Sequence, residues 1–110
     1  MILRGKNLDF VILLDVYGDV LTLRQRDFLE LYYCNDLSLS EIAEDEGVTR
    51  QAVRDSIKRG EQILADLESK LKLAEKIKGC REIFNKVEEL ALRADIPEIA
   101  GLAARGKELL

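Results

Sequence analysis

The sequence has no histidine and no tryptophan, and only one proline among its 110 residues. Without histidine, a serine or cysteine nucleophile would lack its usual general base. No glycine-rich loop that could hold a phosphate is present either. Carboxylates such as Glu41 and Asp45 lie four residues apart, a spacing more typical of a charged helix face than of an acid–base pair. The sequence therefore argues against an enzyme.

Cysteine is also scarce, since the chain has only Cys34 and Cys80. Two cysteines are too few for a disulfide scaffold. A zinc site needs about four thiolate or imidazole ligands, and this chain cannot supply them. We expect no metal and no cofactor. Both cysteines are expected to be small buried residues on helix faces, with a redox-active disulfide as the alternative.

Long hydrophobic runs are absent too. The apolar run Phe10–Leu14 is interrupted by Asp15, and no stretch approaches the roughly 18 apolar residues of a membrane span. The run is also too short for the core of a signal peptide. We therefore expect no membrane span and a cytoplasmic location.

The residues that are present suit one domain of helices with solvated outer faces, since 47% are hydrophobic and 35% are charged. The net charge of −4 argues mildly against a nucleic-acid binder, which is usually basic. The charge is uneven, however. Residues 36–46 carry five acids and no cation, whereas residues 50–62 carry four cations and two acids. One short helix could therefore attract a polyanion that the whole chain repels.

Apolar residues recur at helical spacing, and no strand-type alternation is long enough to predict a β-strand. An all-α fold is therefore predicted. Its first helix, from Asn7 to about Asp19, is apolar around much of its circumference. That pattern predicts burial on more than one side, and Gly18 weakens the end of the helix.

Two capping boxes predict the starts of the second and third helices. Thr22 is followed three residues later by Gln25, and Ser38 is followed by Glu41. In each box, both side chains satisfy backbone N–H groups of the first turn. The expected ends of these helices are Asn35–Asp36 and Gly47.

Thr49 is expected to cap a fourth helix, from Arg50 to about Lys78. Gly79 would interrupt it before a fifth helix over about Cys80–Ala94. Pro97 suits the first turn of a last, short helix. The expected domains are a helix-turn-helix domain over residues 1–62 and a C-terminal helical extension over residues 63–110, which pack as a single compact unit.

The fourth helix also carries apolar residues close to a heptad seam, which would suit a dimer. Alternatively, the fifth helix folds back at Gly79 and covers the same face within one chain. The sequence leaves both arrangements open. The residues near the seam are Ile57, Leu64, Leu67, Leu71 and Ala74.

Residues 38–57 fit a helix-turn-helix position by position. Ala43 is small at the point where the two helices would cross closely, and Gly47 would make the sharp turn between them. Glu46 departs from the pattern, because an apolar residue often packs there; it must point outward or meet a cation. The apolar residues expected to form the small core of the motif are Ile42, Val48, Val53 and Ile57.

The fourth helix would be the recognition helix. At about 100° per residue, Val53 and Ile57 face the core and the opposite face is polar. Arginine and glutamine can hydrogen-bond to base edges in the major groove, and lysine and arginine can neutralise phosphates. The alternative is a solvated face with i,i+4 pairs such as Asp55–Arg59. The candidate nucleic-acid-binding residues are Arg50, Gln51, Arg54, Lys58 and Arg59.

Several segments carry a resemblance to known families, among them Leu14–Gly18, Leu21–Thr22, Leu31–Tyr33, Leu39–Ala43, Arg50–Val53 and Ile57–Arg59. The part from Leu21 to Arg59 resembles the fourth region of bacterial sigma factors. More closely, residues 7–90 resemble the YlxM family of small bacterial helix-turn-helix proteins. Arg54 departs from that family, where an aromatic residue is expected, and this favours charge-based contact over stacking.

The resemblance implies a sigma-region-4-like topology with a helical C-terminal part. It also implies a link to the signal recognition particle pathway, because genes of the family lie beside those of the particle's GTPases. One hypothesis is therefore a DNA-binding regulator. A homodimer is compatible with it, because helix-turn-helix proteins commonly bind DNA as dimers. The other is a protein- or RNA-interaction module that modulates the particle without binding DNA.

Overall fold

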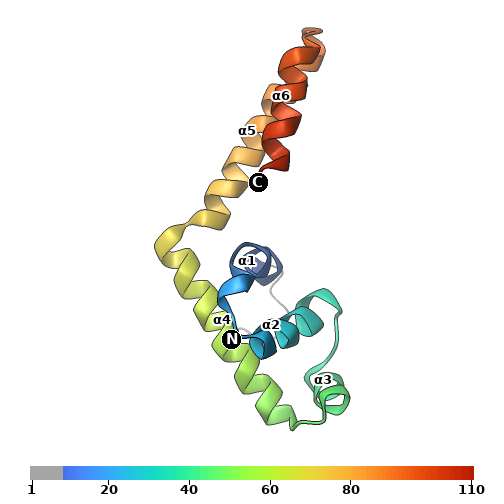
Figure 1. Ribbon diagram of the computed structural model, residues 1–110, viewed down its shortest axis with the longest axis vertical. Coiled ribbons are helices and arrows are strands. Elements are labelled where there is room, and N and C mark those ends of the chain that lie inside the picture. The colour runs from blue at the N-terminus through green and yellow to red at the C-terminus, as the bar shows by residue number, and fades with distance from the viewer. Residues whose placement is uncertain (1–8) are drawn as a thin grey trace. The chain divides into compact units, whose positions relative to one another are not determined.

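The computed structural model describes residues 9–110 (Figure 1). Within that range no residue belongs to a β-strand, so the predicted all-α class is confirmed. The expected helix start at Asn7 lies outside the described residues. None of the described helices is long and apolar enough to cross a membrane. The elements are α1 (Asp9–Tyr17), the 3-10 turn η1 (Gly18–Val20), α2 (Leu23–Leu29), the π-helical turn η2 (Glu30–Cys34), α3 (Leu39–Glu46), α4 (Arg50–Leu71), α5 (Leu73–Arg93) and α6 (Pro97–Glu108).

The helices begin and end where local hydrogen bonds dictate. Both predicted capping boxes are present: the Thr22 hydroxyl accepts from the Gln25 N–H at 3.1 Å, and the Ser38 hydroxyl accepts from the Glu41 N–H at 3.1 Å. The Thr49 hydroxyl accepts from the N–H of Ala52 at 3.0 Å and caps α4. These bonds each span three residues, which is why the sequence alone could predict them.

The long helices are divided at a different residue from the one expected. Lys72 adopts a left-handed conformation with φ of 55°, and its N–H bonds to the Glu68 carbonyl at 2.9 Å, which ends α4. The expected break at Gly79 is wrong, because Gly79 lies inside α5. One glycine costs a helix only about 1 kcal/mol, which its neighbours offset.

The described residues form two compact units, divided between Lys72 and Leu73. The boundary expected at residue 62 would fall inside α4. In the first unit, α1, α2 and α3 all pack against α4. In the second, α5 and α6 lie side by side as a helical hairpin (Figure 1).

Most of the apolar stripe of α4 is buried inside the first unit. Val53, Ile57 and Leu64 have no exposed surface, and Leu67 packs against them. Of the other two residues near the predicted seam, Leu71 is 53% exposed and Ala74 belongs to α5. Since α1 and α2 cover this stripe, neither a coiled-coil dimer through it nor a cover by the fifth helix is needed. The heptad-like spacing of α4 therefore marks an intramolecular core.

One acid lies in this core, which the sequence did not predict. Glu61 has no exposed surface. The Tyr33 hydroxyl donates a hydrogen bond to its Oε2, while its Oε1 has no hydrogen-bond partner. Burial raises the pKa of the Glu61 carboxyl, although the Tyr33 hydrogen bond and the charge of Lys58 oppose this.

The expectation of buried cysteines is wrong, because Cys34 and Cys80 are both exposed and carry free thiols. Cys34 is the last residue of the π-helical turn, which the helical periodicity of the sequence does not reveal. Cys80 lies in the second unit, where only alanines are buried. Neither thiol contributes to a hydrophobic core.

Candidate nucleic-acid interface

The turn between α3 and α4 has the geometry of a helix-turn-helix. Gly47 ends α3 with φ of 67°, a conformation that favours glycine. The Val48 N–H bonds back to the Ala43 carbonyl at 3.1 Å. Ala43 and Ile42 are buried where the helices pack, and Val48 is partly buried. Glu46 is exposed and points outward, which resolves its departure from the apolar pattern.

The outer face of α4 is polar and accessible. Gln51, Asp55, Lys58 and Gln62 are all exposed, opposite the buried stripe. Arg50 and Arg59 are exposed as well, and Arg54 is half-buried. The structure thus brings the five candidate residues, Arg50, Gln51, Arg54, Lys58 and Arg59, onto the accessible part of one helix.

The cations of this face form no ion pairs with neighbouring acids among the described residues, although the charge of Lys58 acts on the buried Glu61 carboxyl. Among residues 9–110, Arg50, Arg54, Lys58 and Arg59 make no ion pair within 4 Å. The Asp55–Arg59 pair that the alternative interpretation would require is not formed. Asp55 instead accepts a hydrogen bond from the Gln51 amide at 2.9 Å, which ties the two polar side chains together. The four cations remain available to an external anion.

A groove lies beside this face, between the start of α2 and the N-terminal half of α4. Its α4 wall contains Arg59, and its α2 wall contains Arg24. The Arg24 guanidinium lies 5.2 Å from the centre of the Phe28 ring, a cation–π contact. Arg24 was missed in the sequence because only tertiary packing brings α2 beside α4. The full lining is Thr22, Arg24, Gln25, Ala52, Asp55, Ser56 and Arg59.

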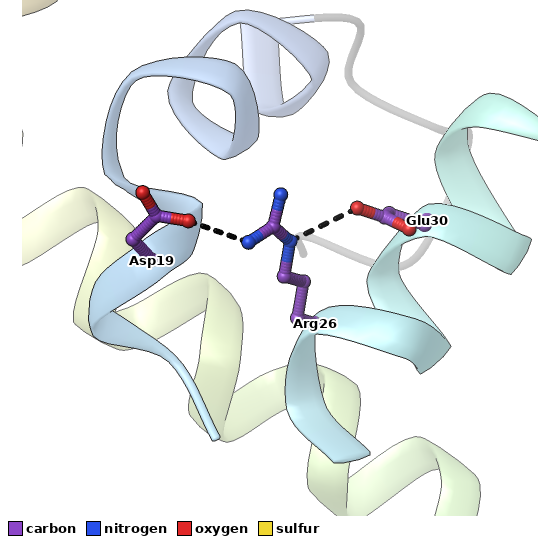
Figure 2. Close-up of polar contacts among 3 residues, drawn as sticks. All are labelled: Asp19, Arg26 and Glu30. Atoms are coloured by element: carbon purple, nitrogen blue, oxygen red, sulfur yellow. Dashed lines mark hydrogen bonds and ion pairs between the residues drawn. The ribbon is translucent and has the colours of Figure 1, made fainter. Parts of the chain in front are cut away.

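A neighbouring arginine of α2 has a different role. Figure 2 shows Arg26 between Asp19 and Glu30, with Nη1 at 2.5 Å from Asp19 Oδ1 and Nε at 3.1 Å from Glu30 Oε1. The hydrogen bond to Glu30, followed by that to Asp19, raises the pKa of Arg26. Arg26 therefore links η1 to α2, and its charge is already balanced by two carboxylates.

The acids of the motif lie on α3, the other helix of the turn. Glu41, Glu44, Asp45 and Glu46 are exposed along it. These acids give α3 a negative surface next to the cationic face of α4. A polyanion would therefore favour the side of α4 that adjoins α2 over the side that adjoins α3.

The fold, the tight turn and the exposed outer helix together define a helix-turn-helix protein. Residues 5–100 match the family described as "Putative helix-turn-helix protein, YlxM / p13 like" (UPF0122). The chain belongs to this family, so the resemblance noted in its sequence is confirmed.

Relatives with similar sequences occur in several bacteria. The chain is 49% identical over 79 residues to the UPF0122 protein YlxM of Bacillus subtilis (strain 168), covering 72% of each chain. It is 53% identical over 75 residues to a UPF0122 protein of Desulforamulus reducens, covering 64% of each. It is 54% identical over 71 residues to a UPF0122 protein of Clostridium kluyveri, also covering 64% of each.

Proposed function

We propose that this protein is a regulatory DNA-binding protein of the cytoplasm, without catalytic activity, whose α4 contacts duplex DNA. The observation that carries the proposal is the set of four cations on α4 that make no ion pair among residues 9–110. On a recognition helix, such cations can contact phosphates and guanine edges. Arg24 at the neighbouring groove extends the same charge onto α2.

The acidic charge of the chain shapes how such binding would behave. The net charge of −4 opposes long-range attraction to DNA, so the contact depends on short-range pairing with phosphates. Gln51 already donates to Asp55, and this leaves base contacts chiefly to the arginines. We therefore expect binding that is strongly weakened by salt and only moderately selective for sequence.

The first test is a fluorescence-anisotropy titration of the full chain against duplex DNA and structured RNA across a salt series. We expect binding that falls steeply with salt, and a slope of log K against log salt that decreases by about one for Lys58→Ala, one phosphate contact being lost. Arg54→Ala should weaken binding as well, because this arginine borders the exposed face of the same helix.

Lys70→Ala is the matched control, since Lys70 is an exposed cation near the far end of α4. It removes the same charge from the same helix but leaves the motif intact. An equal loss with Lys70→Ala would mean that net charge, and not the motif, governs binding. No salt-sensitive binding to either ligand would contradict the proposal.

The second candidate is a protein- or RNA-interaction module that modulates the signal recognition particle. The acidic surface of α3 favours it, because exposed carboxylates suit a protein partner better than a nucleic acid. It predicts that the chain changes GTP turnover by the particle and its receptor, and that Glu44→Lys reduces the change. Unaltered turnover would count against this candidate.

A homodimer would place two recognition helices on one duplex, as helix-turn-helix proteins commonly do. We include a dimer in the proposal. Because Val53, Ile57 and Leu64 of α4 are buried, its apolar stripe offers little surface for such a dimer.

A further inference from the structure

The second unit lacks a hydrophobic core of its own. Its buried residues are four alanines, Ala74, Ala91, Ala100 and Ala103. Every larger apolar side chain from Leu73 to Leu110 keeps part of its surface in contact with solvent. The hairpin also spans fewer than the roughly 40 residues below which domains usually need another source of stability. The hairpin should therefore gain stability from a partner.

Two contacts join α5 to α6. Phe84 lies so close to Gly106 that a Cβ on this glycine would be 2.7 Å from the ring. Lys107 Nζ lies 3.0 Å from Glu88 Oε1. Because Phe84 and Glu88 are one helical turn apart, both belong to the row of α5 that faces α6.

Six large apolar side chains gather on one flank of this contact between the helices. At about 100° per residue, Ile83, Val87 and Leu90 of α5 lie on the flank of Phe84 that is away from Glu88. On α6, three apolar residues lie within about 60° of Gly106, and the antiparallel direction of α6 puts them on the same flank. We call this set the hairpin face; its members and exposed fractions are Ile83 65%, Val87 38%, Leu90 50%, Ile99 42%, Leu102 62% and Leu109 88%.

We propose that the hairpin face binds the same face of a second copy of this chain, forming a symmetric four-helix bundle. The exposed fractions correspond to apolar surface on the order of 600 Å² per copy, close to the roughly 800 Å² per partner of a standard stable interface. In the bundle the leucines and isoleucines of both copies would form the core that the single hairpin lacks.

The charges of the hairpin favour a second copy as the occupant. Residues 73–110 carry seven cations and seven acids, so two hairpins have no net repulsion. The whole net charge of −4 lies in residues 1–72. A nucleic acid would require an excess of cations, which the hairpin does not have. The hairpin face is apolar, and the charges around it are balanced in sign. Such a face on one copy is therefore complementary to the same face on a second copy.

The test is the mass of the full chain by light scattering or sedimentation, over a range of about 1 µM to 1 mM. We expect a dimer of twice 12.5 kDa that dissociates on dilution. Ile83→Glu should weaken dimerisation at least tenfold, because the symmetry places two carboxylates in the apolar interface. Leu102→Glu, on the other helix, should do the same.

Leu92→Glu is the matched control, because Leu92 is 65% exposed like Ile83 but lies on the Glu88 side of α5. It should leave the dimer intact, and far-UV circular dichroism should show equal helix content in all variants. A monomer at every concentration would overturn the proposal and leave another protein as the occupant. Equal loss with Leu92→Glu would overturn it too. These mass measurements are made without nucleic acid, so their result is independent of the proposed DNA binding.

Discussion

Gly60→Ala is expected to destabilise the first unit by on the order of 1–2 kcal/mol, although alanine is the better helix former. A Cβ on Gly60 would lie 2.6 Å from Leu29 Cδ1. Leu29 has no exposed surface, so a shift of its side chain would press on neighbours in a close-packed core. The free-energy cost of this steric clash exceeds the stabilisation that comes from the higher helix propensity of alanine. Gly60 therefore allows the close approach of α2 to α4.

Tyrosine fluorescence during urea unfolding measures this effect in the first unit. The chain has three tyrosines and no tryptophan, and Tyr17, Tyr32 and Tyr33 all precede Lys72. Gly79→Ala is the control, because nothing lies within 4 Å of a Cβ at that position in α5. This control substitution should stabilise its helix by about 0.5–1 kcal/mol. Urea unfolding monitored by far-UV circular dichroism measures that change. A stabilising Gly60→Ala would contradict the packing argument.

Tyr33→Phe is expected to cost about 1–3 kcal/mol at pH values above the raised pKa of Glu61, since it leaves the buried carboxylate without the hydrogen bond from the Tyr33 hydroxyl. The cost should shrink at low pH, where the carboxyl is protonated. Urea unfolding at a series of pH values, monitored by far-UV circular dichroism, measures the loss of stability and its dependence on pH. A loss that does not depend on pH would mean that the effect comes from packing alone.

Glu61→Gln tests the same pair from the other side. Burial raises the pKa of Glu61 above its usual 4.5, so the folded chain holds this proton at pH values where the unfolded chain has lost it. The contribution of Glu61 to the free energy of unfolding is therefore largest below pH 4.5 and falls as the pH rises through the raised pKa. Glu61→Gln should remove that fall. Glu46→Gln, which alters an exposed acid, should leave the pH profile unchanged.

Local features of this protein were predictable from its residues. The capping boxes at Thr22 and Ser38, the Thr49 cap and the turn at Gly47 all appear where expected. Each depends on bonds or dihedral angles within a few residues, so no other part of the chain needs to be known. The polar and buried faces of α4 follow in the same way from the helical repeat.

Features that depend on which helices meet were not predictable. The buried position of Glu61 and the place of Arg24 at the groove both require α2 to lie beside α4. The exposure of Cys34 depends on a π-helical turn, and that of Cys80 on a hairpin whose buried residues are alanines. Likewise, an apolar stripe on α4 looks the same in sequence whether a second chain or α1 and α2 cover it.

The sequence by itself therefore determined the helix starts, the tight turn and the cationic outer face of α4, because short-range hydrogen bonds and helical periodicity decide them. Only the tertiary structure decided that most of the α4 stripe is internal and that α5 and α6 leave an apolar face exposed. Those outcomes depend on the packing of segments far apart in the chain, and a helical repeat specifies a buried face without specifying what covers it.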